Sequence, residues 1–383
     1  MEIVSNPMRD SGSHGFCTAE AADAARSTLS RWASYSATPL LSLDELARDL
    51  RLGEIRLKHE GSRFGIGSFK ALGAAYALES LLERRRSFDS DHRKTKIPIA
   101  SCASDGNYGR AVAWAAQQLG CGCVVYLPRH VTEYREEAIR RYGAETVRVQ
   151  ANYDAAEVAV KRATVQHDWI FLSDSSHSNY TVTPRDVMLG YSVMLSEIAD
   201  SVSLADFTHV FLQCGVGAFA GAVCDYLYSL LGPKAPIIIS VEPVRAACVF
   251  ASVKRGRATL VRGALTTIMG GLACGRPSPI AWDLLRTRLS FCMTLDDRWA
   301  MQAVRLLASG RASGEPVVAG ETGAAGLGAL LFGGSDERFR SQLGLNSSSR
   351  VLLFCTEGAT DPGVYTSIIR ENEDSLSDTQ FVI

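Results

Sequence analysis

The sequence predicts an α/β fold with two domains, in which parallel-rich twisted sheets are flanked by helices. The chain has 383 residues, which is enough for two domains of ordinary size. Hydrophobic residues make up 46% of it and aromatic residues 8%, so a substantial core can form. From residue 97 onward, short apolar runs alternate with helical stretches. This alternation is typical of βαβ units and a parallel sheet.

The expected strands are short apolar runs, and the expected helices have helical periodicity. In residues 54–60, Ile55 and Leu57 alternate with polar neighbours, as in a half-buried strand. The further strands are expected at 97–102, 122–127, 146–149, 169–172, 208–212, 236–241 and 350–354. The helices are expected at 71–82, 108–119, 132–142, 154–166 and 186–198.

A charged run at 83–96 has no apolar face and indicates a surface linker between domains. We therefore expect a large cofactor-binding domain formed by residues 1–95 and 205–383. The small domain is expected at residues 96–204.

The composition indicates which binding partners and which cellular location to expect. The 40 basic residues nearly balance the 41 acidic ones, so no global field favours nucleic acid or a membrane. No run of about 18 apolar residues occurs, and the polar N-terminal segment lacks a leader pattern, so we expect a cytoplasmic protein. Cys121 and Cys123 have no second cysteine pair near them, and we expect no metal site.

Lys70 is the first candidate for a reactive side chain. It follows a glycine-rich loop and precedes the apolar stretch 71–82, so it is expected at the start of a helix. The helix N-terminus and packing around the lysine stem both favour the neutral, nucleophilic amine. A solvent-facing lysine is the structural alternative. Lys58 is the rival lysine, but it lies on the polar side of a strand beside Glu60, where a solvated or ion-paired role is expected.

Two loops follow predicted strands and carry polar side chains. The first contains Ser104, Asp105, Gly106, Asn107 and Tyr108. It opens a helix, whose backbone amides can bind an anion, although a plain capped helix explains the same residues. In the second loop, Asp174 follows the strand at 169–172, where ligand-facing residues of parallel sheets lie. An Asx turn is the structural alternative for Asp174.

A glycine-rich turn lies between the strand at 208–212 and an apolar helix. Its central residues are Gly215, Val216, Gly217 and Ala218. Glycine lets backbone amides approach phosphate oxygens, and the helix dipole favours the dianion. A dinucleotide loop is the alternative, because Glu242 ends the next strand where a carboxylate could bind a ribose.

Together, these motifs resemble those of fold type II pyridoxal-phosphate enzymes, the group of threonine dehydratase and tryptophan synthase β. Within that group the sequence is most similar to the diaminopropionate ammonia-lyases. The resemblance extends from about Arg56 to Pro362. It implies that Lys70 is the Schiff-base lysine, with Phe69 beside it at the cofactor. It also implies that Asp105 and Asp174 act as acid and base.

The resemblance assigns the remaining loops as well. Asn107 would contact the cofactor ring oxygen, the loop from Ser104 to Tyr108 would hold the substrate carboxylate, and Gly215 to Ala218 would hold the phosphate. Cys355 or Thr356 would face the pyridine nitrogen, as an uncharged partner that suits elimination. Three departures are visible: Tyr108 replaces the usual histidine, Cys355 replaces the usual serine, and the tryptophan near Asp174 is absent.

The predicted function is pyridoxal-phosphate-dependent β-elimination of a small amino acid, most simply 2,3-diaminopropionate, to pyruvate and ammonia. Serine or threonine dehydration is one alternative, and an NAD-dependent oxidoreductase or a binding protein without catalysis are others. The leaving group and the enantiomer stay open at this point. The resemblance also implies a homodimer and allows a disulfide between Cys248 and Cys274, against which a reducing cytosol argues.

Overall fold

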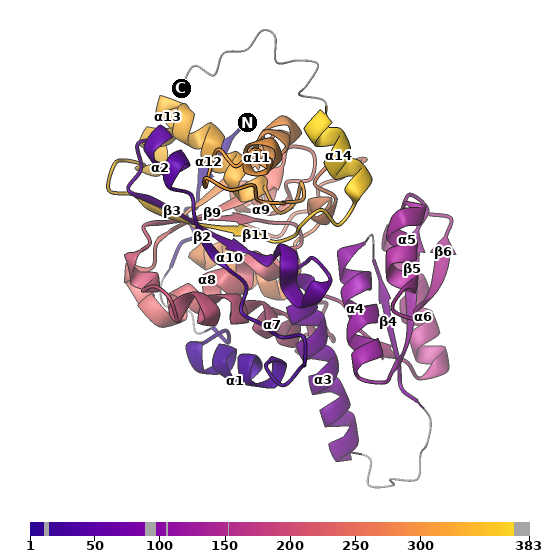
Figure 1. The fold of residues 1–383 in the computed structure, drawn as a ribbon. Coiled ribbons are helices and arrows are strands. Elements are labelled where there is room, and N and C mark those ends of the chain that lie inside the picture. Colours follow the sequence, from indigo (N-terminus) through magenta and orange to yellow (C-terminus); the bar gives the residue numbers. More distant parts are fainter. Residues whose placement is uncertain (11–14, 89–96, 105, 152, 371–383) are drawn as a thin grey trace.

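The computed structural model describes residues 1–10, 15–88, 97–104, 106–151 and 153–370. A seven-stranded sheet forms its centre (Figure 1). The strand order is β1 (Ile3–Ser5), β10 (Phe291–Leu295), β9 (Ile237–Pro243), β8 (His209–Gln213), β11 (Arg350–Cys355), β3 (Glu54–His59) and β2 (Leu40–Ser42). The five central strands are parallel, and only the two edge strands pair antiparallel. The predicted parallel-rich α/β class is confirmed.

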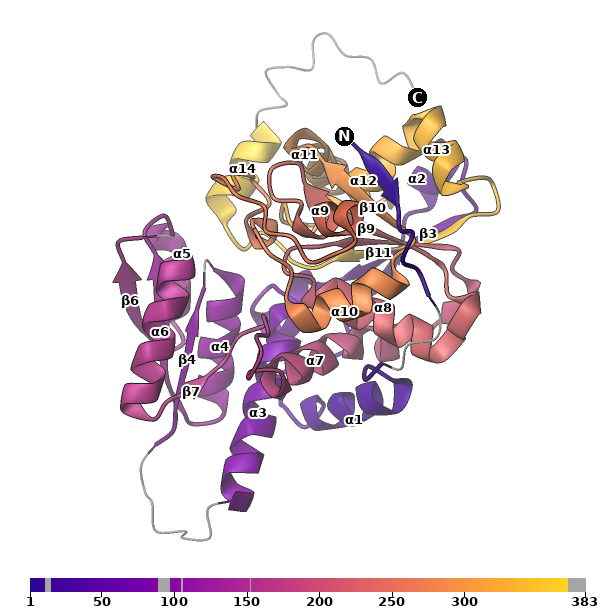
Figure 2. The same cartoon turned by 180° about the vertical axis from the view of Figure 1, so that it is seen from behind.

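A second, four-stranded sheet lies to one side of the first (Figures 1 and 2). Its order is β6 (Glu145–Val149), β5 (Gly122–Pro128), β4 (Ile99–Ala103) and β7 (Ile170–Phe171), and all of its pairs are parallel. The helices that connect these strands are α4 (Asn107–Gln118), α5 (Glu133–Arg140) and α6 (Tyr153–His167). This unit is therefore built from consecutive βαβ crossovers, as the alternating pattern predicts.

Helices cover both faces of the large sheet (Figure 1). One face carries α1 (Ala19–Leu29), α3 (Lys70–Phe88), α7 (Val182–Ala199), α8 (Ala218–Leu231) and α10 (Pro279–Arg288). The other carries α2 (Asp44–Asp49), α9 (Cys248–Arg255), α11 (Asp297–Ala308), α12 (Ala325–Ser335), α13 (Glu337–Leu343) and α14 (Pro362–Arg370). Alternate residues of the strands enter the two apolar clusters, one on each face.

Close packing of α3 against α7 depends on two glycines. A Cβ atom at Gly190 would lie 2.4 Å from the Leu72 carbonyl oxygen and 2.7 Å from the Gly73 Cα atom. These distances are too short for any side chain, so the two helix backbones touch directly at this point. The crossing fixes α7 beside the N-terminal end of α3, where Lys70 lies.

The division into domains remains a proposal, and the structure suggests where to draw it. The strands between residues 96 and 204 all belong to the small sheet. However, α7 lies among α1, α3 and α8 beneath the large sheet. We therefore propose that the small domain ends before α7. Among the described residues, no helix is both long and apolar enough to span a membrane.

The expected linker at 83–96 is wrong in its first part, because α3 continues to Phe88. Glutamate and arginine have high helix propensity, so a charged segment can extend a helix beyond the core. The rest of that run lies outside the described residues.

Candidate active site

Lys70 is the first residue of α3, and its side chain points to the end of β7. Lys70 Nζ lies 2.6 Å from Asp174 Oδ2. The side chains are 20% and 13% exposed, so water screens the pair only partly. Two residues 104 positions apart in the sequence thus meet, and both were predicted from the sequence as site residues.

The charge state of Lys70 differs from the expectation. Burial by itself lowers the pKa of Lys70, but the nearby Asp174 carboxylate outweighs burial and raises that pKa above its ordinary value. In this structure the amine is therefore an ammonium. The helix N-terminus and the packing of the stem are local features, whereas the carboxylate that sets the charge comes from a segment 104 positions away.

Three aromatic rings surround the same ammonium. The Lys70 Nζ atom is 5.3 Å from the ring centroid of Phe69, 5.6 Å from that of Tyr108 and 5.7 Å from that of Tyr191. Tyr191 belongs to α7, and sequence reasoning missed it. Its ring fits because Gly73 has no Cβ atom, which would lie 2.5 Å from Tyr191 Cε1. A glycine inside an alanine-rich helix was the available signal of such a close approach.

The loop before α4 is held by the Ser104 hydroxyl. Ser104 Oγ accepts hydrogen bonds from the backbone amides of Gly106 and Gly109, at 3.0 and 2.7 Å. Asn107 begins α4, and its Nδ2 atom donates to the Glu357 carboxylate. Tyr108 is buried, and its hydroxyl has no hydrogen-bond partner among the described residues. Asp105, the other predicted acid or base, lies outside the described residues.

The Glu357 carboxylate joins the two sheet units. Besides the bond from Asn107, it accepts one from the backbone amide of Thr322 at 3.1 Å. Burial raises the pKa of Glu357. Arg135 of α5 approaches the same region, with Nε 3.3 Å from Asp361 Oδ2. The predicted Asn107 is thereby oriented by Glu357, a residue for which no role was predicted.

The glycine turn connects β8 to α8. Gly217 has a φ of +96°, which favours glycine, and a Cβ there would lie 2.7 Å from Leu285 Cδ1. Within the described part of the chain, the backbone amides from Gly215 to Phe219 donate to no carbonyl or side chain. These open donors at a helix N-terminus fit a phosphate dianion. Cys248 is a free thiol that donates to the Gly215 carbonyl at 3.5 Å.

Cys355 and Thr356 lie on different sides of β11. Cys355 packs in the apolar cluster on the face away from Lys70, together with Leu57 and Leu353. Thr356 follows the strand, and its carbonyl accepts the Phe69 amide at 3.0 Å, so it lies next to the start of α3. Its hydroxyl oxygen accepts a hydrogen bond from Gln213 Nε2 at 3.0 Å, which leaves the hydroxyl proton for another acceptor.

Glu242 does not fit a dinucleotide site. Its carboxylate accepts the backbone amides of Val249 and Phe250, at 2.7 and 2.6 Å. The side chain is fully buried, and burial raises its pKa to about 8. The carboxylate that would have to bind a ribose is thus engaged inside the protein. This finding removes the support for the NAD-dependent alternative.

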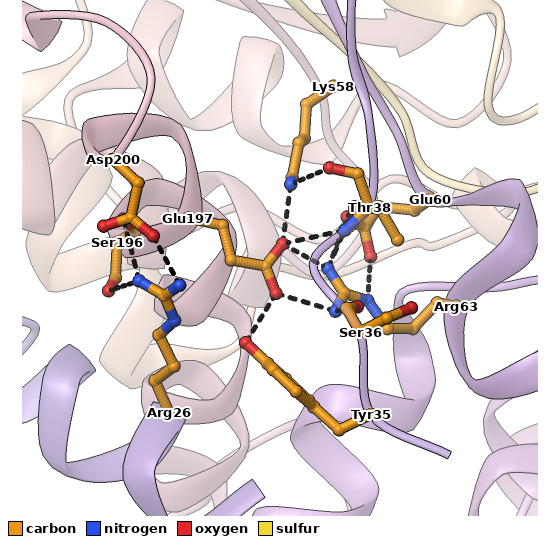
Figure 3. Close-up of polar contacts among 10 residues, drawn as sticks. All are labelled: Arg26, Tyr35, Ser36, Thr38, Lys58, Glu60, Arg63, Ser196, Glu197 and Asp200. Atoms are coloured by element: carbon orange, nitrogen blue, oxygen red, sulfur yellow. Dashed lines mark hydrogen bonds and ion pairs between the residues drawn. The ribbon is translucent and has the colours of Figure 1, made fainter. Parts of the chain in front are cut away.

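Lys58 is part of a buried ionic network (Figure 3). Its Nζ atom lies 2.6 Å from Glu197 Oε2 and 2.6 Å from the Thr38 carbonyl. Arg63 binds Glu197 at 2.7 Å and Glu60 at 2.7 Å. Two cations therefore balance two carboxylates, and the expected ion pair is found. Because Arg63 belongs to the loop before Lys70, the network also anchors that loop to α7.

The residues present therefore suit pyridoxal phosphate: a lysine at a helix start, open amides for a phosphate and a threonine hydroxyl near the lysine. Among the described residues, no group of three or more His, Cys, Asp or Glu side chains is arranged to hold a metal ion.

Comparisons with known proteins agree with this arrangement. A family model described as pyridoxal-phosphate dependent enzyme matches residues 32–357. Diaminopropionate ammonia-lyase of Escherichia coli strain K12 is 36% identical over 358 residues, which cover 90% of each chain. The L-threonine dehydratase of Haemophilus influenzae is 29% identical over 291 residues, covering 76% of this chain and 52% of that protein.

The chain is also similar in structure to solved diaminopropionate ammonia-lyases. A crystal structure of holo diaminopropionate ammonia-lyase from Escherichia coli has a TM-score of 0.90, with 33% identity and 97% coverage of both chains. The same enzyme in complex with an aminoacrylate–PLP azomethine reaction intermediate also has a TM-score of 0.90, at 34% identity.

Proposed function

Because the chain belongs to the pyridoxal-phosphate-dependent enzymes, we propose that Lys70 holds this cofactor and that 2,3-diaminopropionate is the substrate. The protein is a pyridoxal-phosphate-dependent ammonia-lyase that acts by β-elimination. The observation that supports the site assignment is the 2.6 Å contact between Lys70 Nζ and Asp174 Oδ2. An amine and a carboxylate that lie this close together can exchange a proton, and this supports the assignment.

We assign the cofactor contacts by chemistry. The open amides from Gly215 to Ala218 would hold the phosphate, and the positive end of α8 would favour its charge. The Thr356 hydroxyl would serve the pyridine nitrogen, in preference to Cys355, whose thiol lies on the other face of β11. Asn107, oriented by Glu357, would serve the ring oxygen. When bound, pyridoxal phosphate supplies an electron sink that acidifies the Cα–H bond of an amino acid.

The chain's own groups then move the protons. Asp174 is within hydrogen-bond distance of Lys70, so a proton can pass between Oδ2 and Nζ. Either of these atoms can take the proton from Cα, and the other can protonate the departing amine. Asp105 is the second proposed carboxylate, and by resemblance it serves the D enantiomer while Asp174 serves the L enantiomer. Water then hydrolyses the released enamine, so the products are pyruvate and two molecules of ammonia.

Absorbance and product assays test this proposal. Purified protein should show a visible band of lysine-bound cofactor that borohydride abolishes. Lys70→Ala should lose both the band and turnover, whereas Lys58→Met, which keeps the length of the stem, should keep the band. Loss of the band in the Lys58 variant alone would assign the cofactor to Lys58.

The substrate is tested by release of pyruvate and ammonia from both enantiomers of 2,3-diaminopropionate, with L-serine and L-threonine alongside. Turnover of L-threonine well above that of diaminopropionate would place the protein among the dehydratases. A cytoplasmic homodimer is part of the same proposal, and light scattering after size-exclusion chromatography tests the assembly.

A further inference from the structure

We propose that Asp174 and the ring faces of Phe69, Tyr108 and Tyr191 form an ammonium-binding site that selects a substrate with a charged β-amino group. This inference rests on the proposed function, because it presumes that the substrate's α-amine takes the place of Lys70 on the cofactor. Asp174 and the three rings are the groups that would distinguish an ammonium from the hydroxyl of serine.

The first observation is how the chain accommodates its own ammonium. Lys70 Nζ has a carboxylate oxygen at 2.6 Å and three ring centroids between 5.3 and 5.7 Å. The face of an aromatic ring is electron-rich and attracts a cation within about 6 Å. A carboxylate together with several ring faces is the composition of sites that recognise ammonium ligands.

The second observation concerns two tyrosine hydroxyls. Both are buried; that of Tyr108 makes no hydrogen bond among the described residues, and that of Tyr191 interacts with the Lys70 ammonium. A phenol oxygen is an acceptor, and an ammonium has three N–H donors. Burial raises the pKa of Tyr191 more than the charge of Lys70 lowers it, so this hydroxyl stays protonated. The effect of Lys70 on that pKa shows that the hydroxyl lies close to the ammonium. Leaving the Tyr108 oxygen unpaired is costly, and the Tyr191 oxygen loses its cationic partner when Lys70 is displaced, unless a ligand donates to both.

Covalent geometry brings the substrate's second nitrogen to this place. With the α-nitrogen in the place of Lys70 Nζ, the β-nitrogen of 2,3-diaminopropionate would be three bonds away, about 3 Å. An ammonium there falls within reach of the same carboxylate and the same rings. A serine hydroxyl in that position carries no charge, so it gains nothing from the ring quadrupoles.

Replacing the tyrosine rings tests whether the ring faces bind the substrate's β-ammonium. Tyr191→Leu and Tyr108→Leu remove a ring, whereas Tyr191→Phe and Tyr108→Phe keep it and remove only the hydroxyl. We expect each leucine variant of the holoenzyme to lower the ratio of kcat/KM for 2,3-diaminopropionate to that for L-serine by about 3- to 30-fold. Each phenylalanine variant keeps the ring face and loses only the acceptor oxygen, so it should lower the ratio less than the matching leucine variant does. Tyr226→Leu, a buried tyrosine of α8 outside the site, is the matched control and should leave the ratio unchanged.

A binding measurement without turnover completes the test. In Lys70→Ala, which removes the chain's own ammonium, ethylammonium should bind measurably by calorimetry and ethanol should not. Adding Tyr191→Leu should abolish that binding, and adding Tyr191→Phe should not. Equal loss of kcat/KM for both substrates, or absence of ethylammonium binding, would overturn the ammonium site. If wild type does not release ammonia from diaminopropionate but ethylammonium binds, the proposed function fails independently of the site.

Discussion

Replacing Glu197 by glutamine tests whether the buried ionic network holds the Lys70 loop in place. The Glu197 carboxylate accepts hydrogen bonds from Lys58, Arg63 and Tyr35, and its side chain is fully buried (Figure 3). Glutamine has the same shape but no charge. The variant therefore leaves Lys58 and Arg63 with only the Glu60 carboxylate as a counter-charge in a buried region.

The structure gives the size of the effect in two ways. Breaking a buried ion pair by removing one partner costs about 3–5 kcal/mol. Burial raises the pKa of Glu197, but Arg63 and Lys58 outweigh burial and lower it from 4.5 to about 2. That change corresponds to about 3 kcal/mol of stability. Because the folded-state pKa is lowered, this contribution is complete above about pH 4.5 and is lost as the pH falls towards 2.

Urea unfolding followed by circular dichroism measures the effect. At pH 7 we expect the Glu197→Gln variant to unfold at a clearly lower urea concentration. Between pH 5 and 3 the variant should lose less stability than wild type, since the titrating group is gone. Asp200→Asn is the control, because the Arg26–Asp200 pair is 26% and 58% exposed and should matter little. Equal midpoints for wild type and Glu197→Gln would refute the role given to the network.

Three further predictions follow from close contacts and charges. Gly190→Ala should separate α3 from α7, lower the free energy of unfolding by about 1–3 kcal/mol and weaken cofactor retention. Gly333→Ala is the control and should be tolerated, because the nearest neighbour of its Cβ would lie at 3.4 Å. Thermal melts and cofactor titration compare the two variants. Gly217→Val should weaken pyridoxal phosphate binding because of its φ of +96° and the 2.7 Å clash, and unchanged affinity would contradict the phosphate assignment. Asp105→Asn and Asp174→Asn should impair D- and L-2,3-diaminopropionate unequally and in opposite senses, which steady-state kinetics on each enantiomer would show.

Local sequence patterns indicated several residues of the candidate site. Lys70, Asp174 and Gly217 each lie at the end of a regular element, where a glycine, a cap or the end of an apolar run marks the boundary. Parallel strands place such boundaries at one edge of a sheet, so Lys70 after β3 and Gly217 after β8 could be expected to converge. Asp174 follows β7 of the small sheet, and only the packing of the two sheets brings it to Lys70. The choice between Cys355 and Thr356 was not accessible, because the faces of β11 differ only through what packs on each.

The sequence by itself determined the fold class and the order of the βα units, and it indicated Lys70 as the candidate reactive lysine, because these depend on periodicity and on residues adjacent in the chain. Only the tertiary structure decided the charge of Lys70, which depends on a carboxylate 104 positions away. It also brought Tyr191 to the site through the contact between Gly73 and Gly190. Charge and ring contacts act over a few ångströms in space, and only folding brings such distant residues within that range.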